Sequence, residues 1–328
     1  MKNKFLFVLL LLISISVVSF CSTFFYVKYN KVEVVETDMF IMTSCNPVYL
    51  AACNVVGDID GITVENLSQP TTGCLHDYTL TTEDMKNLAT ADVLIVNGGG
   101  MEGYLEDVIA AYPDLTIIDT FEGVEDTYPI IAEAEDEEEH EEEHEEEHVH
   151  GEEGEEHHHH GEFNSHIWMS EEIYAGQVIA IADGLADIDE AHATEFKANA
   201  NSFNDIMKSH IDKSGLDEVL AGENVAVLHE AFAYTAQSLG ANVVATMDLD
   251  EERQVSAGEV SSFIDSINKN NVKVVFAEYD YGHAMGKLIE EQTDAKVVYL
   301  ETLVHGTYDK DDYITVLSKN YALIQNSL

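Results

Sequence analysis

The sequence predicts an α/β protein of two Rossmann-like lobes, each built on a parallel sheet, joined by one long rigid helix. Apolar runs typical of strands alternate with helical stretches in the first third of the chain, and the same alternation returns in the last third. A long stretch without proline lies between them. Regular strand–helix alternation is the signature of α/β folds, and the 328 residues suffice for two domains of ordinary size.

The first lobe is expected to contain four strands separated by helices. The strands are Phe40–Thr43, Ile62–Leu67, Val93–Val96 and Thr116–Ile118, and the helices run from Pro47 to Val56, Thr82 to Ala91 and Met101 to Tyr112. Proline is tolerated in the first turn of a helix, and Thr81 or Thr82 can cap the second helix. The wholly apolar run Val93–Val96 indicates a parallel strand buried on both faces. Gly98–Gly100 form the expected turn into the third helix.

The second lobe repeats this pattern. Its expected strands are Val225–Leu228, Val243–Ala245, Val272–Phe276 and Lys296–Leu300, and its helices are Glu230–Leu239, Ala257–Lys269, Ala284–Glu291 and Asp312–Gln325. The stretch between the lobes, Glu171 to about Leu220, predicts helix with an interruption near Asp187–Asp189. The connecting helix, from about Glu190 to Leu220, would be about 40 Å long and would act as a stiff rod.

These elements predict a domain organisation. Residues 1–30 form a signal or anchor segment, and 37–170 form the first lobe, with a His/Glu-rich loop at 132–163. Residues 171–222 form the helical connection, and 223–328 form the second lobe.

The N-terminal segment has the pattern of an export signal. Two lysines within the first four residues precede an apolar run from Phe5 to about Val27. Either lipid on Cys21 anchors the mature protein, or the run stays as a membrane helix, for which about 20 apolar residues suffice. Both outcomes place residues from about 31 onward on the outer face of the cell membrane. The basic start and the length of the run disfavour a buried core helix.

Residues 133–162, here called the His/Glu tract, consist almost entirely of acidic residues and histidine. Such a segment has too little apolar surface to build a core. Histidine is a common ligand of transition metals, so the tract is expected to be a mobile, solvated collector of weakly bound metal. Its expected auxiliary ligands are His140, His144, His148, His150, His157, His158, His159 and His160. A plain acidic solubilising tract or a purification tag would leave the three-glutamate spacing of the first histidines unexplained.

The charge of the chain excludes some partners. Its formal net charge is −48, and the tract contributes 17 acidic residues and no lysine or arginine, so the remainder still carries −31. Nucleic acid and anionic membrane surfaces are therefore poor partners, while cations are favoured.

Four residues outside the tract are candidate metal ligands. His76 lies in the loop after the second strand, and His166 lies between the tract and the long helix. His229 and Glu301 each follow a strand of the second lobe. In open α/β sheets ligands bind at the carboxyl ends of strands, and three imidazoles with one carboxylate suit tetrahedral zinc. Glu278, His305 or water compete with Glu301 for the fourth position.

Three segments carry a family resemblance. Ser68–Tyr78, Asn164–Ser170 and Leu228–Tyr234 resemble the ligand segments of the metal-binding subunits of zinc and manganese ABC importers, the cluster A-I solute-binding proteins. The resemblance covers nearly all of the chain from about residue 38. It includes a His-rich loop before the second ligand, a feature of zinc-selective members.

The resemblance implies two α/β lobes joined by one long helix, a metal site at His76, His166 and His229, and an ABC permease as partner. The third ligand in that family tends to be His in zinc binders and Glu in manganese binders, so His229 indicates zinc, which suits imidazole better than manganese does. Two departures stand out. The family usually has Asp-Pro-His where this chain has Asn164-Ser165-His166, and Asp where it has Glu301.

Three cysteines follow the export segment. Cys45, Cys53 and Cys74 make an odd number, which outside the cytoplasm leaves at least one free thiol or an intermolecular bond. Because Cys45 follows the first strand and Cys74 precedes His76, both are expected to border the metal cleft. Three interpretations of the cysteines stay open. They are a Cys45–Cys74 disulfide with Cys53 as a buried thiol, free structural cysteines, and thiolate ligation of the metal.

The sequence thus predicts an extracytoplasmic, high-affinity zinc-binding protein that delivers Zn²⁺ to an ABC-type permease. It is expected to be a monomer that touches the membrane only through its N-terminal anchor. It is not expected to be an enzyme, since no His-Glu-x-x-His helix and no serine nucleophile elbow occur, although three histidines with an open position also suit a catalytic zinc. Alternatives are a zinc-buffering or adhesin-like surface protein and a manganese-binding homologue.

Overall fold

The computed structural model describes residues 39–68, 78–132, 163–247, 249 and 255–328. The predictions for the export segment, the His76 loop with Cys74, and the His/Glu tract lie outside these residues. None of the helices in the described part of the chain is long and apolar enough to span a membrane.

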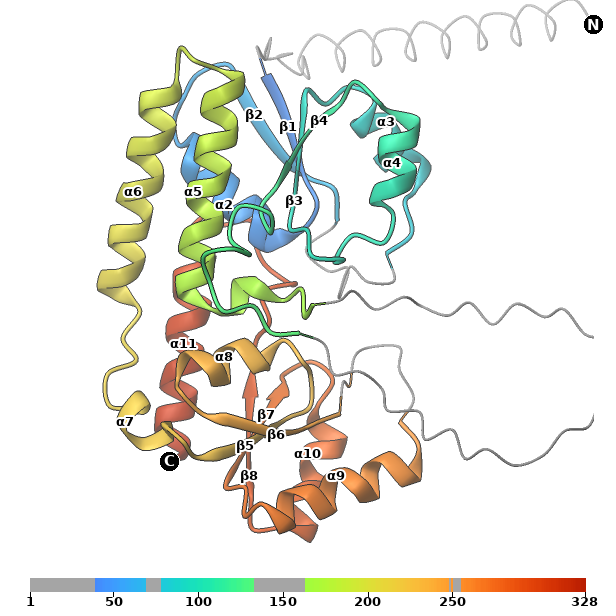
Figure 1. Cartoon of the computed structure of the whole chain (residues 1–328), viewed down its shortest axis with the longest axis vertical. Coiled ribbons are helices and arrows are strands. Elements are labelled where there is room, and N and C mark those ends of the chain that lie inside the picture. Colours follow the sequence, from blue (N-terminus) through green and yellow to red (C-terminus); the bar gives the residue numbers. More distant parts are fainter. Residues whose placement is uncertain (1–38, 69–77, 133–162, 248, 250–254) are drawn as a thin grey trace, which may run out of the picture. The chain divides into compact units, whose positions relative to one another are not determined.

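The first lobe is a four-stranded parallel sheet with helices on both faces (Figure 1). Its elements are β1 (Met39–Thr43), α2 (Asn46–Val56), β2 (Ile62–Asn66), α3 (Thr82–Leu88), β3 (Val93–Val96), α4 (Leu105–Ala111) and β4 (Thr116–Asp119), and the strand order is β2-β1-β3-β4. Successive side chains of a strand point to opposite faces. Thus Ile41 packs in the core on the α2 side, and Met42 packs with Leu88 of α3 and Val108 of α4.

The second lobe has the same architecture. Its elements are β5 (Asn224–Val227), α8 (Phe232–Ser238), β6 (Asn242–Thr246), α9 (Ala257–Lys269), β7 (Val274–Glu278), α10 (His283–Gln292), β8 (Lys296–Leu300) and α11 (Asp312–Ser327). The strand order is β6-β5-β7-β8, and all pairs are parallel. In both lobes the order reverses beside the first strand, and ligands of open α/β sheets bind at such a switch point. The predicted fold class is confirmed.

The helical connection differs from the predicted rod. It forms α5 (Glu171–Ile188), α6 (Ala193–His210) and the short α7 (Leu216–Leu220), with α5 and α6 packed side by side (Figure 1). The interruption near Asp187–Asp189 is confirmed, but the expected extension of the connecting helix to Leu220 is wrong. Helix α6 has 18 residues, a length of about 27 Å. It ends because Ile211 is extended and Gly215 adopts a φ of +85° that favours glycine.

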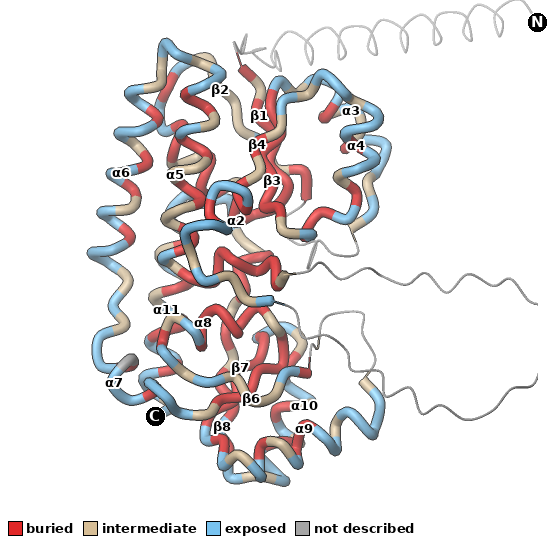
Figure 2. Tube along the Cα trace, viewed as in Figure 1, coloured by how far each residue is buried: buried red, intermediate tan, exposed pale blue. Residues whose placement is uncertain are grey.

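The two lobes share one hydrophobic core. A continuous buried cluster runs from Ile41 in the first lobe through Trp168 to Phe276 in the second (Figure 2). At its centre the rings of Tyr174 on α5 and Tyr313 on α11 stack at 3.5 Å with an interplanar angle of 8°. Because such a core is close-packed, relative motion of the lobes would have to disrupt it.

A loop of the second lobe also binds helix α2 of the first. The side-chain amide of Asn46 donates to the Leu303 carbonyl at 2.8 Å, and that of Asn54 donates to the Lys310 carbonyl at 2.8 Å. The rings of Tyr49 and Tyr308 meet edge to face at 4.9 Å. These contacts lie apart from the stacked tyrosines, so the lobes are held together at more than one place.

Metal binding is therefore expected to leave the arrangement of the lobes nearly unchanged. Hinge closure needs loop residues that absorb large dihedral changes, whereas these lobes share a packed core and several hydrogen bonds. Small-angle scattering of a variant without residues 133–162 should give the same radius of gyration with zinc and with EDTA. The Tyr313→Leu variant lacks the stacked ring. It is the control that shows whether scattering detects a weakened contact between the lobes. A clear decrease in the wild-type radius on adding zinc would exclude the rigid arrangement.

The cysteines are only partly as predicted. Cys45 is buried at the start of α2, and Cys53 on α2 is half-buried, whereas the disulfide alternative expected a buried thiol there. It lies on the face of α2 that turns toward Tyr49 and Lys310, and its partial burial raises the pKa of the thiol. Because Cys74 lies outside the described residues, the Cys45–Cys74 disulfide stays a prediction.

Candidate metal centre

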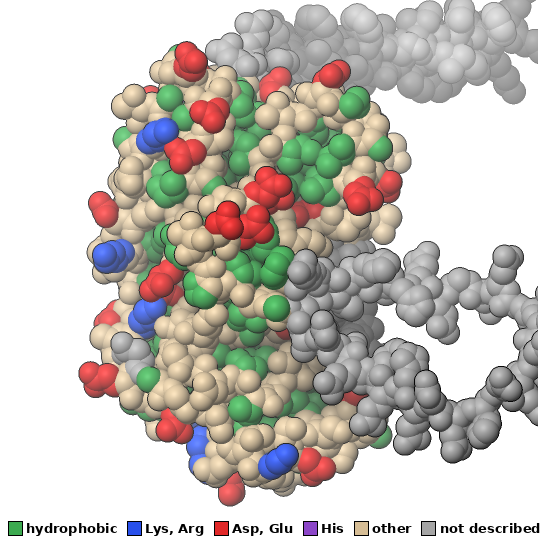
Figure 3. Space-filling view, in the orientation of Figure 1, with side chains coloured by type: hydrophobic (Ala, Val, Ile, Leu, Met, Phe, Trp, Pro, Cys, Tyr) green, Lys and Arg blue, Asp and Glu red, His purple; other side chains and the backbone are tan. Residues whose placement is uncertain are grey.

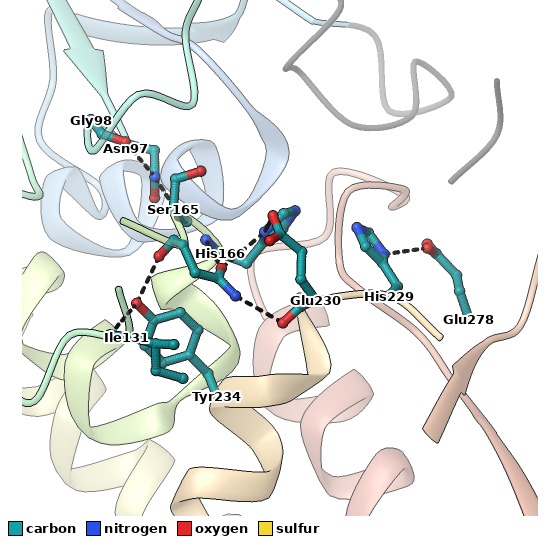
Figure 4. A network of polar contacts seen from close by, with 10 residues as sticks. Asn97, Gly98, Ile131, Ser165, His166, His229, Glu230, Tyr234 and Glu278 are labelled. Atoms are coloured by element: carbon teal, nitrogen blue, oxygen red, sulfur yellow. Dashed lines mark hydrogen bonds and ion pairs between the residues drawn. The ribbon is translucent and has the colours of Figure 1, made fainter. Parts of the chain in front are cut away.

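Two of the predicted ligands, His166 and His229, lie together between the lobes (Figure 4). His166 precedes a short 3₁₀ helix, Ile167–Met169, and His229 follows β5. Their side chains are 0% and 3% exposed, and the ring centroids are 4.9 Å apart at an interplanar angle of 81°. Burial of two histidines side by side is costly unless they stay neutral or bind a cation.

A carboxylate fixes the orientation of His229. Its Nδ1 lies 2.7 Å from Oε2 of Glu278, the last residue of the neighbouring strand β7. The other oxygen of Glu278 accepts a hydrogen bond from the Thr302 hydroxyl at 2.6 Å. A carboxylate at Nδ1 selects the tautomer in which Nε2 has a free lone pair for a metal and makes that nitrogen more basic.

His166 has a comparable environment. Its Nδ1 lies 3.2 Å from Oδ1 of Asn164 and 3.2 Å from Oε1 of Glu230. Glu230 belongs to the second lobe and directly follows His229. Both imidazoles therefore have oxygen acceptors at Nδ1, which leaves the two Nε2 atoms as candidate metal ligands.

The segment before His166 is held by both lobes. The Asn164 N–H donates to the Ile131 carbonyl at 2.9 Å, and the Asn164 carbonyl accepts from the Tyr234 hydroxyl at 2.7 Å. The Asn164 side-chain amide donates to the Glu230 carbonyl at 2.9 Å. Burial raises the pKa of Tyr234, so its hydroxyl remains a donor at neutral pH.

The ligand role of Glu301 stays a prediction, and its carboxylate has a partner in the described part of the chain. Its carboxylate forms an ion pair with Lys319 of α11, and its side chain is 34% exposed. The next residue, Thr302, donates to Glu278 instead. Among the competitors, Glu278 lies beside His229 but at Nδ1, and His305 Nε2 lies 3.2 Å from the Tyr281 hydroxyl.

His76 lies outside the described residues, and its ligand role stays a prediction. Within the part of the chain that the structure describes, no three His, Cys, Asp or Glu side chains are grouped so as to hold a metal ion. His166 and His229 are thus two candidate ligands, and a metal site built on them would need at least one more.

We expect Glu278→Gln to lower metal affinity by about tenfold to a hundredfold, because partners of metal-ligating histidines contribute this much. The glutamine keeps the shape of the side chain, but it has one acceptor oxygen for two donors, His229 Nδ1 and the Thr302 hydroxyl. Competition with a chelator measures the effect. Glu223→Gln, an exposed substitution in the same lobe, is the control and should change nothing. Equal affinity of both variants would argue against the role of Glu278.

Sequence reasoning missed a buried glutamate near this site. Glu102 is 5% exposed and accepts hydrogen bonds from the N–H groups of Asn97, at 2.8 Å, and Gly98, at 3.0 Å. These bonds fold residues 97–104 into a turn, so α4 begins at Leu105 rather than at Met101. A glycine run followed closely by a glutamate was the available signal. Gly98 has a φ of +80°, and a Cβ there would lie 2.0 Å from Asp119 Oδ1.

The burial of Glu102 has a pH consequence. Desolvation raises the pKa of Glu102 from 4.5 to about 7. The N–H groups of Asn97 and Gly98 favour the charged form and lower the pKa, whereas the nearby Asp119 raises it further. Desolvation also raises the pKa of Asp119 to about 6. Between pH 4.5 and about 7 the folded chain thus holds a proton at Glu102 that the unfolded chain releases.

The free energy of unfolding is therefore expected to fall as pH rises through this window, by on the order of 3 kcal/mol from Glu102. Glu102→Gln has no proton to release and should lack this component. Denaturant unfolding of both proteins from pH 4.5 to 8 gives the difference. If the free energy of unfolding depends on pH in the same way in both proteins, Glu102 is already ionised at pH 5 in the folded chain.

Two parallel-sheet lobes with buried histidines between them, each backed by an oxygen acceptor, define a solute-binding protein for a metal cation. The model of the family described as zinc-uptake complex component A, periplasmic, matches residues 41–327. The chain belongs to this family. It is accordingly the extracytoplasmic metal-binding component of an uptake system that works with an ABC permease, and it is not an enzyme.

Relatives within the family differ in the metal that their names state. The chain is 25% identical to the high-affinity zinc uptake system protein ZnuA of Yersinia pestis, over 85% of this chain and 88% of that protein. It is 24% identical to the iron-binding protein YfeA of Yersinia pestis, over 85% and 82%. The structure of FpvC from Pseudomonas aeruginosa in complex with Mn²⁺ matches with a TM-score of 0.71 at 23% identity, covering 88% of this chain and 97% of that one. Likeness to a solved structure at this level establishes the fold.

Proposed function

We propose that this chain captures Zn²⁺ with high affinity outside the cytoplasm and delivers it to an ABC-type permease. The observation that carries this proposal is the buried pair of imidazoles at His166 and His229, each with an acceptor at Nδ1. Such a pair offers two neutral nitrogen ligands in fixed orientations.

Zinc is favoured over manganese by the chemistry of these ligands. Imidazole nitrogen suits zinc, whereas manganese prefers carboxylate, carbonyl and water oxygen. The two carboxylates near the site, Glu278 and Glu230, are hydrogen-bonded at the far nitrogens of the rings. We propose His76 as the third ligand and water at the fourth position, since Glu301 faces Lys319.

The remaining predictions complete the proposal. The His/Glu tract would add weak sites that collect zinc near the cleft, and an N-terminal anchor would keep the monomer at the outer face of the membrane. Acidic side chains outnumber lysines on the face shown in Figure 3, in keeping with the large negative charge of the chain. Such a surface attracts cations and raises their local concentration.

Metal competition tests the choice of zinc. We expect the chain without residues 133–162 to bind Zn²⁺ much more tightly than Mn²⁺. Most sites bind zinc more tightly than manganese, so the His229→Glu variant is the matched comparison. The ratio of its zinc affinity to its manganese affinity should be smaller than that of the wild type. Equal affinity of the wild-type site for the two ions would contradict a zinc site. In the host, loss of the chain should make growth depend on added zinc.

A further inference from the structure

Asn97 and Glu102 form a buried polar junction between the first-lobe sheet and the segment that carries His166. Asn97 follows β3 at the switch point of that sheet, and it is 0% exposed. Its side-chain amide donates to the Ser165 carbonyl at 2.8 Å (Figure 4). We infer that Asn97 and Glu102 are positioning residues that orient His166 for metal binding.

The contact with Ser165 controls a single peptide unit. The carbonyl of that unit belongs to Ser165 and is held by Asn97, while its N–H belongs to His166 and donates to Asn164 Oδ1 at 3.0 Å. A peptide unit is planar, so hydrogen bonds at both of its ends fix its rotation. The direction in which the His166 side chain leaves the backbone is then fixed as well.

Asn97 itself cannot turn away from Ser165. Its Oδ1 accepts a hydrogen bond from Gln177 of α5 at 3.0 Å, and its backbone carbonyl accepts one from the Thr120 hydroxyl at 2.9 Å. With the amide oxygen held by Gln177, the amide nitrogen has to face Ser165. Gln177 also donates to Thr120 at 2.8 Å, which ties the junction to the end of β4.

Glu102 acts one step further from the metal. Its carboxylate accepts the N–H groups of Asn97 and Gly98 and so holds the backbone from which the Asn97 side chain extends. Burying a carboxyl group costs free energy, and the turn at residues 97–104 could be closed without one. Because both bonds go to one carboxyl group, they fix the backbone at Asn97 and Gly98 and thus the position from which the Asn97 side chain extends.

This inference rests on the proposed function, because it assigns residues that orient a ligand of that site. The test uses the full chain at less than one zinc per molecule, so that the tightest site fills first. Zinc affinity is measured by competition with a chelator for the wild type, Asn97→Asp and Glu102→Gln. The visible spectrum of bound Co²⁺ reports the ligand geometry. Asn199→Ala is the control, since the Asn199 amide donates to the Val55 carbonyl at 3.0 Å between α6 and α2.

We expect Asn97→Asp and Glu102→Gln to lower zinc affinity by about tenfold to a hundredfold and to change the Co²⁺ spectrum. Asn199→Ala should lower the melting temperature and leave affinity and spectrum unchanged. If Asn97→Asp does not fold, Gln177→Met should still weaken zinc binding severalfold, because it removes the amide that donates to Asn97 Oδ1 and to the Thr120 hydroxyl. Wild-type affinity and spectrum in folded Glu102→Gln and Gln177→Met would overturn the positioning role. A wild-type chain that binds no zinc would overturn the proposed function instead.

Discussion

Replacing His229 with alanine is expected to lower the zinc affinity of the cleft by about a thousandfold or more, because a missing ligand leaves the ion under-coordinated. A thousandfold change corresponds to about 4 kcal/mol. The substitution also removes the hydrogen bond between His229 and the buried Glu278, whose other oxygen accepts from Thr302. Chelator competition on a variant without residues 133–162 measures the loss at the cleft alone.

Glu301→Ala is the matched comparison for His229→Ala. Both residues follow a strand of the second lobe, and both were expected to bind the metal. The Glu301 carboxylate pairs with Lys319 on the surface, so its removal should change zinc affinity less than about threefold, as is usual for a surface ion pair. The reverse ranking, with Glu301→Ala the more harmful, would show that Glu301 turns into the cleft when metal binds.

Deleting residues 133–162 is expected to reduce zinc binding from several ions per chain to one. The tract holds eight of the 15 histidines of the chain. Its dense acidic charge opposes any compact arrangement. Metal bound there would have to order the chain, at a cost in conformational entropy, and so would bind more weakly than at the cleft. Calorimetry should show two classes of sites in the full chain and one class in the deletion variant.

The structure offers a clean way to remove the tract. Ala132 and Phe163, which flank it, pair through an isolated antiparallel bridge, so a short turn can join them. A chain with all eight tract histidines changed to glutamine is the control, because it keeps the acidic charge. If calorimetry resolves only one class of sites in the full chain, the tract does not bind zinc. If deletion removes most of the tight binding, the high-affinity site lies in the tract rather than in the cleft.

Much of the fold was predictable because it depends on local sequence. The β3 run Val93–Val96 is wholly apolar, and α9 follows the predicted bounds Ala257–Lys269. The end of α6 was harder to predict, since Ile211 to Gly215 contain no proline. The helix ends where the chain turns toward α7 and the second lobe, and a single glycine does not reveal this.

The candidate site was likewise predictable from the sequence only in part. The sequence alone determined the two lobes and singled out His166 and His229 as candidate ligands, because parallel strands place their carboxyl ends at one edge of a sheet. Only the tertiary structure decided that Glu278 lies against His229 while Glu301 pairs with Lys319, because residues on neighbouring strands meet only when the sheet forms. It also decided the role of Glu102, whose contacts with Asn97 and Gly98 arise from a turn that no periodicity predicts. A sequence specifies which residues reach an edge, but the direction of each side chain is set by packing.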